Sequence, residues 1–136
     1  MDDQNLIQKD LIKKIVGDAR GAVGIRLCAI GVNLGIFDNL AEYGPATSQE
    51  LAERMKLDER YLREWGLGMF SLGYLDFDKV SRKISLNKEF IPVLVEEGGK
   101  FSQKGLIEIL NSSLLPYHEL LNSFKNGGGI NYDKID

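Results

Sequence analysis

Apolar residues near the start of the chain recur with the spacing of an α-helix. In segment 5–16, Ile7, Leu11 and Ile15 lie four residues apart, and lysines and an aspartate take much of the opposite side. Residues separated by three or four positions share one face of a helix, so this pattern predicts an amphipathic helix. Its apolar face must pack on the core of the chain or on a partner.

The next segment, residues 19–40, is apolar on two sides and is predicted to form a second helix. One stripe consists of Val23, Leu27, Ile30, Leu34 and Phe37, and the other of Ala22, Ile25, Ala29, Val32 and Ile36. A helix that is apolar nearly all round is buried on both faces. Glycines at 21, 24, 31 and 35 favour close approach of another backbone, since each lowers helix propensity. We expect a core side and a subunit-interface side; the alternative is one central core helix. The expected interface residues are Ile25, Ala29, Val32 and Ile36.

A change of period marks the middle of the chain. Thr47 or Ser48 is expected to cap a short helix over 49–55, since Thr47-Ser48-Gln49-Glu50 is a capping-box pattern, and Asp58 is expected to cap a longer helix over 59–72. Segments 74–78 and 82–86 then alternate apolar and polar residues around a turn at 79–81, which predicts a two-stranded ribbon. Short helix, turn, longer helix and ribbon is the order of a winged helix-turn-helix.

The rest of the chain is expected to be helical up to a glycine run. Asn87 precedes a short apolar segment, 88–97, and segments 103–112 and 114–124 carry helical apolar spacing. Gly127-Gly128-Gly129 then breaks the pattern. The sequence therefore predicts a mainly α domain with a small β-ribbon over 1–126 and a Gly-rich hinge over 127–136.

Composition narrows the class of protein. The chain has 136 residues, a net charge of -3 and 43% hydrophobic residues, which suits one soluble globular domain. The start of the chain is polar, so we expect no secretory signal. The most apolar stretch, 23–37, is interrupted by Arg26 and Asn33, so we expect no membrane span. We therefore place the protein in the cytoplasm.

Charge argues against a DNA reader. Residues 47–86 hold seven basic and seven acidic side chains, whereas phosphate binding needs an excess of positive charge. On the predicted helix 59–72, the core side is expected to carry Tyr61, Leu62, Trp65, Met69 and Leu72. The outer side carries Leu67 and Phe70, which predict contact with a protein partner, and Gly66 and Gly68 indicate close packing. The alternative, a DNA-binding winged-helix regulator, would use Arg63, Lys79, Arg82 and Lys83.

Candidate chemistry is sparse. His118 and Cys28 are the only residues of their kinds, so no metal cluster or nucleophilic triad is expected, and no phosphate-binding glycine motif is present. We assign no catalytic, cofactor-binding or metal-ligating residue. Apolar and aromatic residues after Ser102, namely Leu114, Tyr117 and Phe124, are candidates for the wall of a small-molecule pocket.

Several runs resemble small-molecule methyltransferases. They are Gly31–Leu40, Gly44–Ala52, Asp58–Trp65, Gly73–Leu75 and Phe124–Tyr132. The most specific is Arg-Tyr-Leu-Arg-Glu-Trp at 60–65, which is similar to a signature of one bacterial branch.

The resemblance implies a winged-helix N-terminal domain followed by an S-adenosylmethionine-dependent catalytic domain. In that family the N-terminal domain dimerises, often with exchanged helices, and helps to wall the substrate pocket. It therefore implies a homodimer, a catalytic methyltransferase domain as partner and a small-molecule substrate. The methyl-donor site of the family would follow Asp136, so no catalytic residue is carried onto this chain, which by itself is expected to be inactive.

Overall fold

The structure is a computed structural model that describes residues 3–114 and 116–131. The prediction of a mainly α winged helix with a small ribbon is confirmed. The described elements are α1 (Asp3–Asn33), α2 (Ile36–Tyr43), α3 (Ser48–Met55), α4 (Glu59–Ser71), β1 (Asp76–Phe77), β2 (Ile84–Ser85), η1 (Lys88–Phe90), α5 (Ile91–Leu94), α6 (Lys104–Ser113) and α7 (Tyr117–Asn126). Tyr132 and the remainder of the predicted hinge, 132–136, lie outside the described residues, as does Leu115.

The first two helices divide at a different place from the one predicted. α1 runs unbroken through Gly17, where the sequence pattern predicts a junction, because one helical glycine costs only about 1 kcal/mol. The break comes instead at Gly35, whose φ of 68° is left-handed and ends the helical path. α2 then leaves at a bend of 64°. The predicted stripe from Val23 to Phe37 is therefore split between two helices.

The winged helix itself follows the predicted caps. The Thr47 side chain accepts from the Glu50 amide at 3.1 Å, and the Glu50 carboxylate accepts from the Thr47 amide at 2.8 Å. Asp58 accepts from the Tyr61 amide at 3.1 Å and so begins α4. These bonds satisfy amides that have no partner within a helix.

The wing is a shorter ribbon than predicted. β1 and β2 pair antiparallel with Phe77 opposite Ile84, and Ala46 adds a bridge to Ile84 from before α3. Beyond Phe77 the Asp78 amide still donates to the Lys83 carbonyl oxygen at 2.9 Å, and the Asp78 carboxylate accepts bonds from the amides of Val80 and Ser81, which forms the turn. The bridge anchors the wing to the start of α3.

The core lies where the C-terminal half of α1 meets α2 and α4. The rings of Phe37 and Trp65 lie 5.6 Å apart, and a Cβ built on Gly31 would come within 2.5 Å of Phe37 and 2.8 Å of Trp65. The close packing predicted at Gly66 and Gly68 is also found, since a Cβ at these positions would lie 3.2 Å and 3.1 Å from the nearest side-chain atoms. The absence of a side chain at these glycines therefore lets bulky side chains from other elements of the same chain pack closely against the helices.

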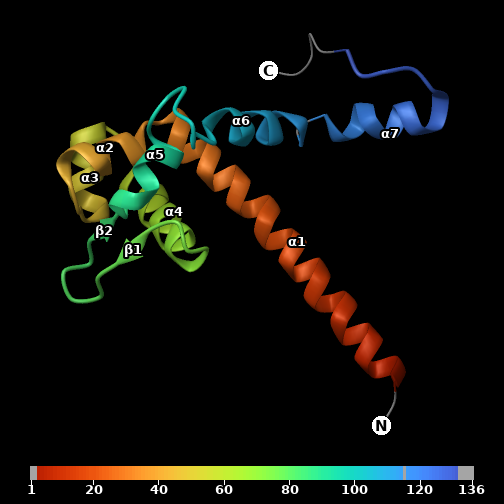
Figure 1. Ribbon diagram of the computed structural model, residues 1–136, viewed down its shortest axis with the longest axis horizontal. Coiled ribbons are helices and arrows are strands. Elements are labelled where there is room, and N and C mark those ends of the chain that lie inside the picture. Colours follow the sequence, from red (N-terminus) through yellow and green to blue (C-terminus); the bar gives the residue numbers. More distant parts are fainter. Residues whose placement is uncertain (1–2, 115, 132–136) are drawn as a thin grey trace.

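The molecule is extended rather than round. Figure 1 shows the N-terminal half of α1 projecting away from the winged-helix body, while α6 and α7 run off in another direction. α6 packs against the C-terminal part of α1. In the part of the chain that the structure describes, no single helix has the length and apolar character of a membrane span, and only the bent pair α1 and α2 meets that test together.

Candidate functional site

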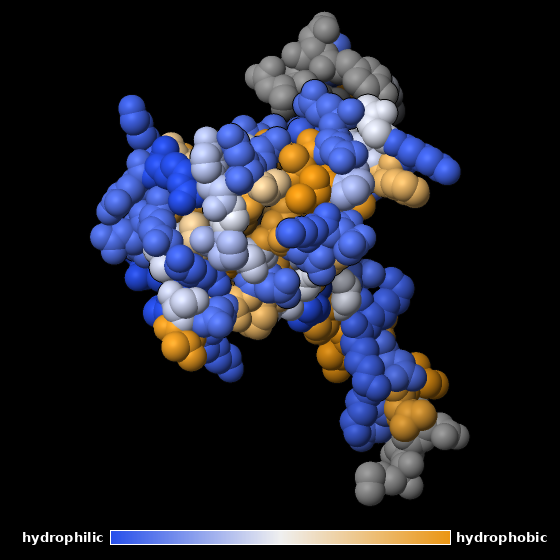
Figure 2. Space-filling view, turned by 60° about the vertical axis from the view of Figure 1, so that its left-hand side comes forward, coloured by the Kyte–Doolittle hydropathy of each residue, from blue (hydrophilic) through white to orange (hydrophobic). Residues whose placement is uncertain are grey.

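The projecting half of α1 carries uncovered apolar side chains, centred on the line of Ile7, Leu11 and Ile15, which we together name the α1 stripe. Its members are large apolar side chains with 53–69% of their surface exposed: Leu6, Ile7, Leu11, Ile12, Ile15 and Val16. Orange apolar patches mark this helix in Figure 2, next to blue polar ones. Lys14 pairs with Asp18 at 2.6 Å, and Lys13 lies 3.6 Å from Asp10. A stripe of this size beside a polar face marks an interaction surface.

The interface residues predicted further along the chain lie elsewhere. Ala29 and Ile36 are only 1% exposed and belong to the core of this chain, while Ile25 and Val32 are partly buried against it. Ala29 and Ile36 are therefore covered within this chain itself, as the alternative of one central core helix expects. That the four residues form a subunit interface stays a prediction.

The outer face of α4 is apolar, as the sequence indicated. Leu67 and Phe70 are exposed there, and the Phe70 ring lies 5.8 Å from that of Phe77 on the wing. Tyr61 is the exception on the side predicted to face the core, since 78% of its surface is exposed. The buried residues of this helix begin at Leu62, so the Tyr61 ring lies outside the core.

A third apolar feature lies between α6 and α7. A groove of about 790 Å³ is lined there by residues that include Ile109, Pro116, Leu120 and Ile130. The predicted wall residues Leu114, Tyr117 and Phe124 do not line it and are exposed. The spacing of apolar residues in the sequence predicted the helix α7, but it did not predict which side of the helix faces the groove.

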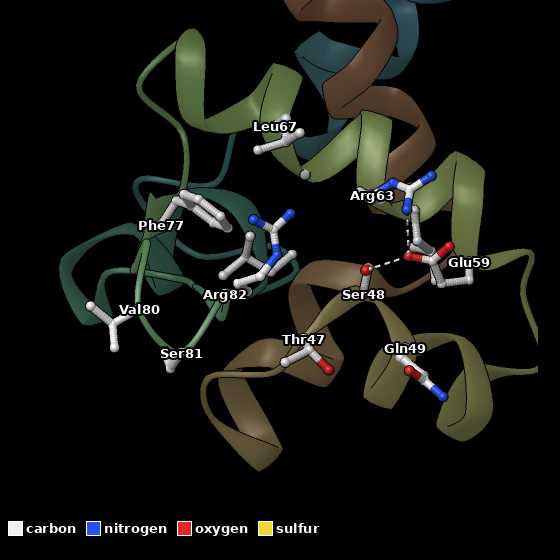
Figure 3. Close-up of a pocket in the computed structure, with 13 residues that line it drawn as sticks. Thr47, Ser48, Gln49, Glu59, Arg63, Leu67, Phe77, Val80, Ser81 and Arg82 are labelled. Atoms are coloured by element: carbon white, nitrogen blue, oxygen red, sulfur yellow. Dashed lines mark hydrogen bonds and ion pairs between the residues drawn. The ribbon is translucent and has the colours of Figure 1, made fainter.

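A smaller groove separates the wing from the two helices of the helix-turn-helix; we name it the wing groove. It measures about 360 Å³ and is lined by Thr47, Ser48, Gln49, Glu59, Leu62, Arg63, Gly66, Leu67, Phe77, Val80, Ser81, Arg82 and Ile84. Figure 3 shows the Arg82 side chain extending from the wing into the space between Phe77 and Ser48. The sequence singled out Arg63, Leu67 and Arg82, but it did not place them around one cavity.

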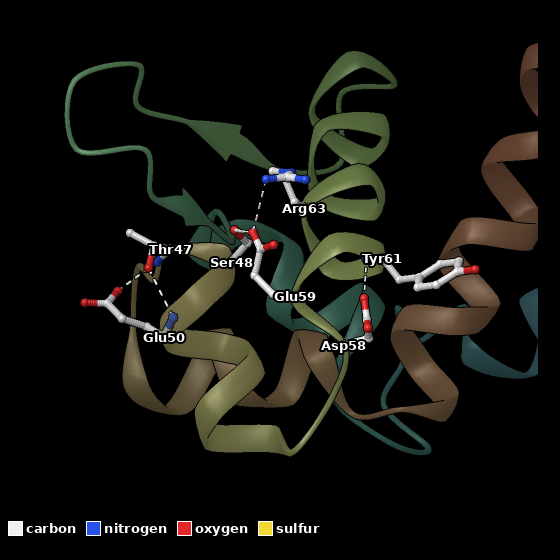
Figure 4. A network of polar contacts seen from close by, with 7 residues as sticks. All are labelled: Thr47, Ser48, Glu50, Asp58, Glu59, Tyr61 and Arg63. Carbon is white, nitrogen blue, oxygen red and sulfur yellow. Dashed lines mark hydrogen bonds and ion pairs between the residues drawn. The ribbon is translucent and has the colours of Figure 1, made fainter.

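A polar network fixes the helical wall of the wing groove. The Ser48 hydroxyl donates to Glu59 Oε1 at 2.7 Å, and Arg63 Nη1 lies 3.7 Å from the same oxygen. These contacts join the first turn of α3 to the first two turns of α4 (Figure 4). The Glu59 carboxylate is therefore already engaged by a hydroxyl and a guanidinium.

The four cations predicted for DNA contact are not equally free. Arg63 is paired with Glu59, and Lys83 lies 3.8 Å from Glu50. Lys79 and Arg82 form no ion pair within residues 3–114 and 116–131, and the Arg82 guanidinium lies 5.8 Å from the centre of the Phe77 ring. A surface with half of its cations paired and with exposed leucine and phenylalanine is poorly suited to a phosphate backbone.

Titratable groups show structural roles. Burial raises the pKa of the Cys28 thiol to about 11, with an opposing effect from its hydrogen bond to Tyr74. The Thr47 amide lowers the pKa of Glu50, and the Ser81 amide lowers the pKa of Asp78. Within the described residues, no three His, Cys, Asp or Glu side chains gather as a metal site.

The elements and their surfaces define a winged helix-turn-helix domain with apolar faces suited to protein contact. The family of Rv2258c-like winged HTH domains matches residues 21–95, more than half of the chain, and the chain belongs to this family. No curated protein matches it in sequence.

In solved structures with the same fold, the matching region is one part of a longer chain. Similar structures include PigF with SAH (TM-score 0.67, 19% identity, 84% of this chain and 33% of that chain). They also include the mitomycin 7-O-methyltransferase MmcR, with a TM-score of 0.69 and 18% identity, covering 92% of this chain and 37% of that chain. A third is an O-methyltransferase family 2 protein from Planctomyces limnophilus in complex with apigenin. Its TM-score is 0.60 and its identity 26%, covering 90% of this chain and 35% of that chain. This chain therefore spans about a third of the length of these proteins.

Proposed function

We propose that this chain is the dimerisation and substrate-pocket domain of an S-adenosylmethionine-dependent methyltransferase, without activity of its own. The observation that carries the proposal is the α1 stripe, whose six large side chains are all more than half exposed. Monomeric soluble proteins rarely expose this many large apolar side chains together, so we expect a protein partner to cover them. A second copy of the chain supplies the same apolar stripe and is the simplest cover.

The geometry of α1 suits such an assembly. A helix of 31 residues extends about 46 Å, and about half of it has no packing partner within the described chain. Completing the burial of a half-exposed Leu or Ile contributes about 1 kcal/mol, so two stripes supply about 12 kcal/mol. Association costs about 4–15 kcal/mol. The stripe alone thus roughly offsets that cost, and the exposed apolar residues of α6 and α7 are the additional surface that makes the dimer stable.

The association with a methyltransferase is supported by the solved structures of the same fold. PigF is described with SAH, and MmcR is a mitomycin 7-O-methyltransferase. Residues 3–114 and 116–131 hold no strand followed by a Gly-rich loop and a helix, the unit that binds nucleotide-like cofactors, which supports placing the methyl-donor site outside them. We assign methyl-donor binding and methyl transfer to a separate catalytic domain, joined through a Gly-rich hinge at 127–136 to the domain 1–126, in a cytoplasmic enzyme.

A role in the substrate pocket is supported by the groove between α6 and α7. Its walls combine the apolar Ile109, Leu120 and Ile130 with serine hydroxyls. Ligand sites usually combine an apolar lining with a few polar groups, and their volumes are about 300–1,000 Å³. With its neighbours Leu114, Tyr117 and Phe124, this end of the chain is our candidate for one wall of the pocket.

Sedimentation velocity of the purified chain tests the proposal. We expect a dimer at tens of micromolar, and a monomer at that concentration contradicts dimerisation. Calorimetric titration with S-adenosylmethionine should show no binding by this chain. Saturable binding of the methyl donor at micromolar concentration would contradict its assignment to a separate domain.

A further inference from the structure

We propose that the wing groove is a binding site for a small organic carboxylate with an apolar body, held by Arg82 and by the apolar wall of Leu67 and Phe77. The site is separate from the proposed dimer surface and from the groove between α6 and α7, and it adds a ligand to the proposed function. It rests on the cavity, on one uncompensated cation and on the apolar surface beside that cation.

Arg82 provides the positive charge. Its φ of 57° lies in the left-handed region, which arginine rarely adopts and which costs about 1–3 kcal/mol. This backbone places the guanidinium over the Phe77 ring, 5.8 Å from its centre, and Figure 3 shows it extending into the groove. No carboxylate pairs with it in the part of the chain that the structure describes, so its fork of donors is free to hold a carboxylate.

The acids near the groove are each engaged by other groups. Glu59 is engaged by the Ser48 hydroxyl at 2.7 Å and by Arg63 at 3.7 Å. Asp78 points into its own turn, where it accepts bonds from the amides of Val80 and Ser81. Among the residues that line the groove, Arg63 balances Glu59, so Arg82 leaves one net positive charge, which matches a single carboxylate.

The other surfaces favour an apolar body on the ligand. Leu67 from α4 and Phe77, Val80 and Ile84 from the wing all line the cavity. The volume of about 360 Å³ accommodates a single aromatic ring with a short acid chain and is at the lower end of ligand sites, about 300–1,000 Å³. Duplex DNA fits less well, because Arg63 and Lys83 are already paired with acids.

Fluorine NMR of the full chain with para-fluorophenylacetate tests this site. We expect the probe signal to broaden in a saturable manner, and the uncharged amide, para-fluorophenylacetamide, to bind at least about tenfold more weakly, since a charged hydrogen bond is lost. Arg82→Gln should weaken binding of the acid by a similar factor. Arg82→Lys should recover part of the loss, because it keeps the charge but not the fork.

Lys79→Gln is the matched control, because it removes a positive charge from the same wing without altering the groove lining. It should leave binding within about twofold of the parent chain. The proposal is overturned if the probe shows no saturable broadening at millimolar concentration or if the amide binds as well as the acid. It is also overturned if Lys79→Gln and Arg82→Gln weaken binding equally, or if both variants reduce a gel shift with duplex DNA, which would make the wing a phosphate contact. Because α1 takes no part in the groove, these outcomes do not depend on whether the chain sediments as a dimer.

Discussion

The Trp65 indole nitrogen donates a hydrogen bond to the Leu27 carbonyl oxygen at 2.9 Å, which ties the middle of α4 to α1. The same indole lies against Phe37, the residue that brings α2 back onto the core. One side chain therefore joins three helices. Because α1 also carries the exposed stripe, this contact connects the winged-helix body to the surface proposed for dimerisation.

Trp65→Phe is expected to lower the free energy of unfolding by about 2–4 kcal/mol. The change removes a hydrogen bond that contributes about 0.5–1.5 kcal/mol and leaves space in a buried site. Tyr61→Phe is the matched control, because Tyr61 is an exposed aromatic residue of the same helix and its change should stay within about 0.5 kcal/mol. Urea unfolding followed by circular dichroism compares the two, and equal effects would contradict the role given to Trp65.

Two glycines of α1 should respond in opposite directions to alanine. Gly31→Ala places a Cβ within 2.5 Å of Phe37 and 2.8 Å of Trp65, and such overpacking costs about 1–3 kcal/mol. Gly17 has no atom within 4 Å of that position, so Gly17→Ala should gain about 1 kcal/mol from helix propensity. Thermal unfolding of both variants measures the difference. A loss of stability at position 17 would mean that another chain packs closely there.

Local chemistry made the winged helix predictable from the sequence. The Thr47 and Glu50 capping pair and the Asp58 cap depend on residues three positions apart, and both formed as predicted. The end of α1 was not predictable in this way. Gly17 and Gly35 look alike in the sequence. The break falls at Gly35, after which Phe37 packs back against Gly31, and the sequence pattern does not specify that contact.

The candidate site was predictable in its parts but not in its assembly. Periodicity identified the apolar face that holds Ile7, Leu11 and Ile15, and it identified Leu67 on the outer face of α4. It could not tell which side of the segment 19–40 the chain itself covers, because that depends on contacts between distant segments. The approach of Arg82 to Phe77 likewise depends on how the two strands of the wing fold back on each other, which periodicity does not specify.

Stability should fall in acid partly through Glu50. Its carboxylate caps the Thr47 amide, which holds the pKa below its ordinary value of 4.5. A lowered pKa in the folded state means that the stabilisation is complete at neutral pH. It is lost as the pH falls from that ordinary value through the pKa of the folded protein. We expect Glu50→Gln to be less stable than the parent at neutral pH and the difference to shrink in acid.

Glu53→Gln is the control for that pH profile, because Glu53 lies on the same helix, is exposed and caps no backbone amide. Denaturant unfolding across the acid range should show a nearly constant, small difference for this variant. A Glu50→Gln profile parallel to that of the parent would contradict the capping role.

The Cys28 thiol should be unreactive in the folded protein. Burial raises its pKa to about 11, so only about one thiol in a thousand is ionised at pH 8, and thiolate is the reactive form. We expect iodoacetamide to label the chain in urea but not under native conditions, as measured by intact mass. Rapid native labelling would show that this part of α1 opens readily.

Polar substitutions in the α1 stripe should separate the two copies of the proposed dimer. Leu11 and Ile15 lie one turn apart on the exposed face, so Leu11→Gln with Ile15→Gln removes four apolar side chains from a symmetric interface. At about 1 kcal/mol for each, the dissociation constant should rise by about 1,000-fold. Lys13→Gln with Lys14→Gln changes two charged residues of the same turns that are not members of the stripe and should leave the constant within about tenfold. Sedimentation equilibrium measures both variants. If the first pair sediments like the parent chain, the stripe does not form the interface, and the exposed apolar residues of α6 and α7 must then hold any dimer alone.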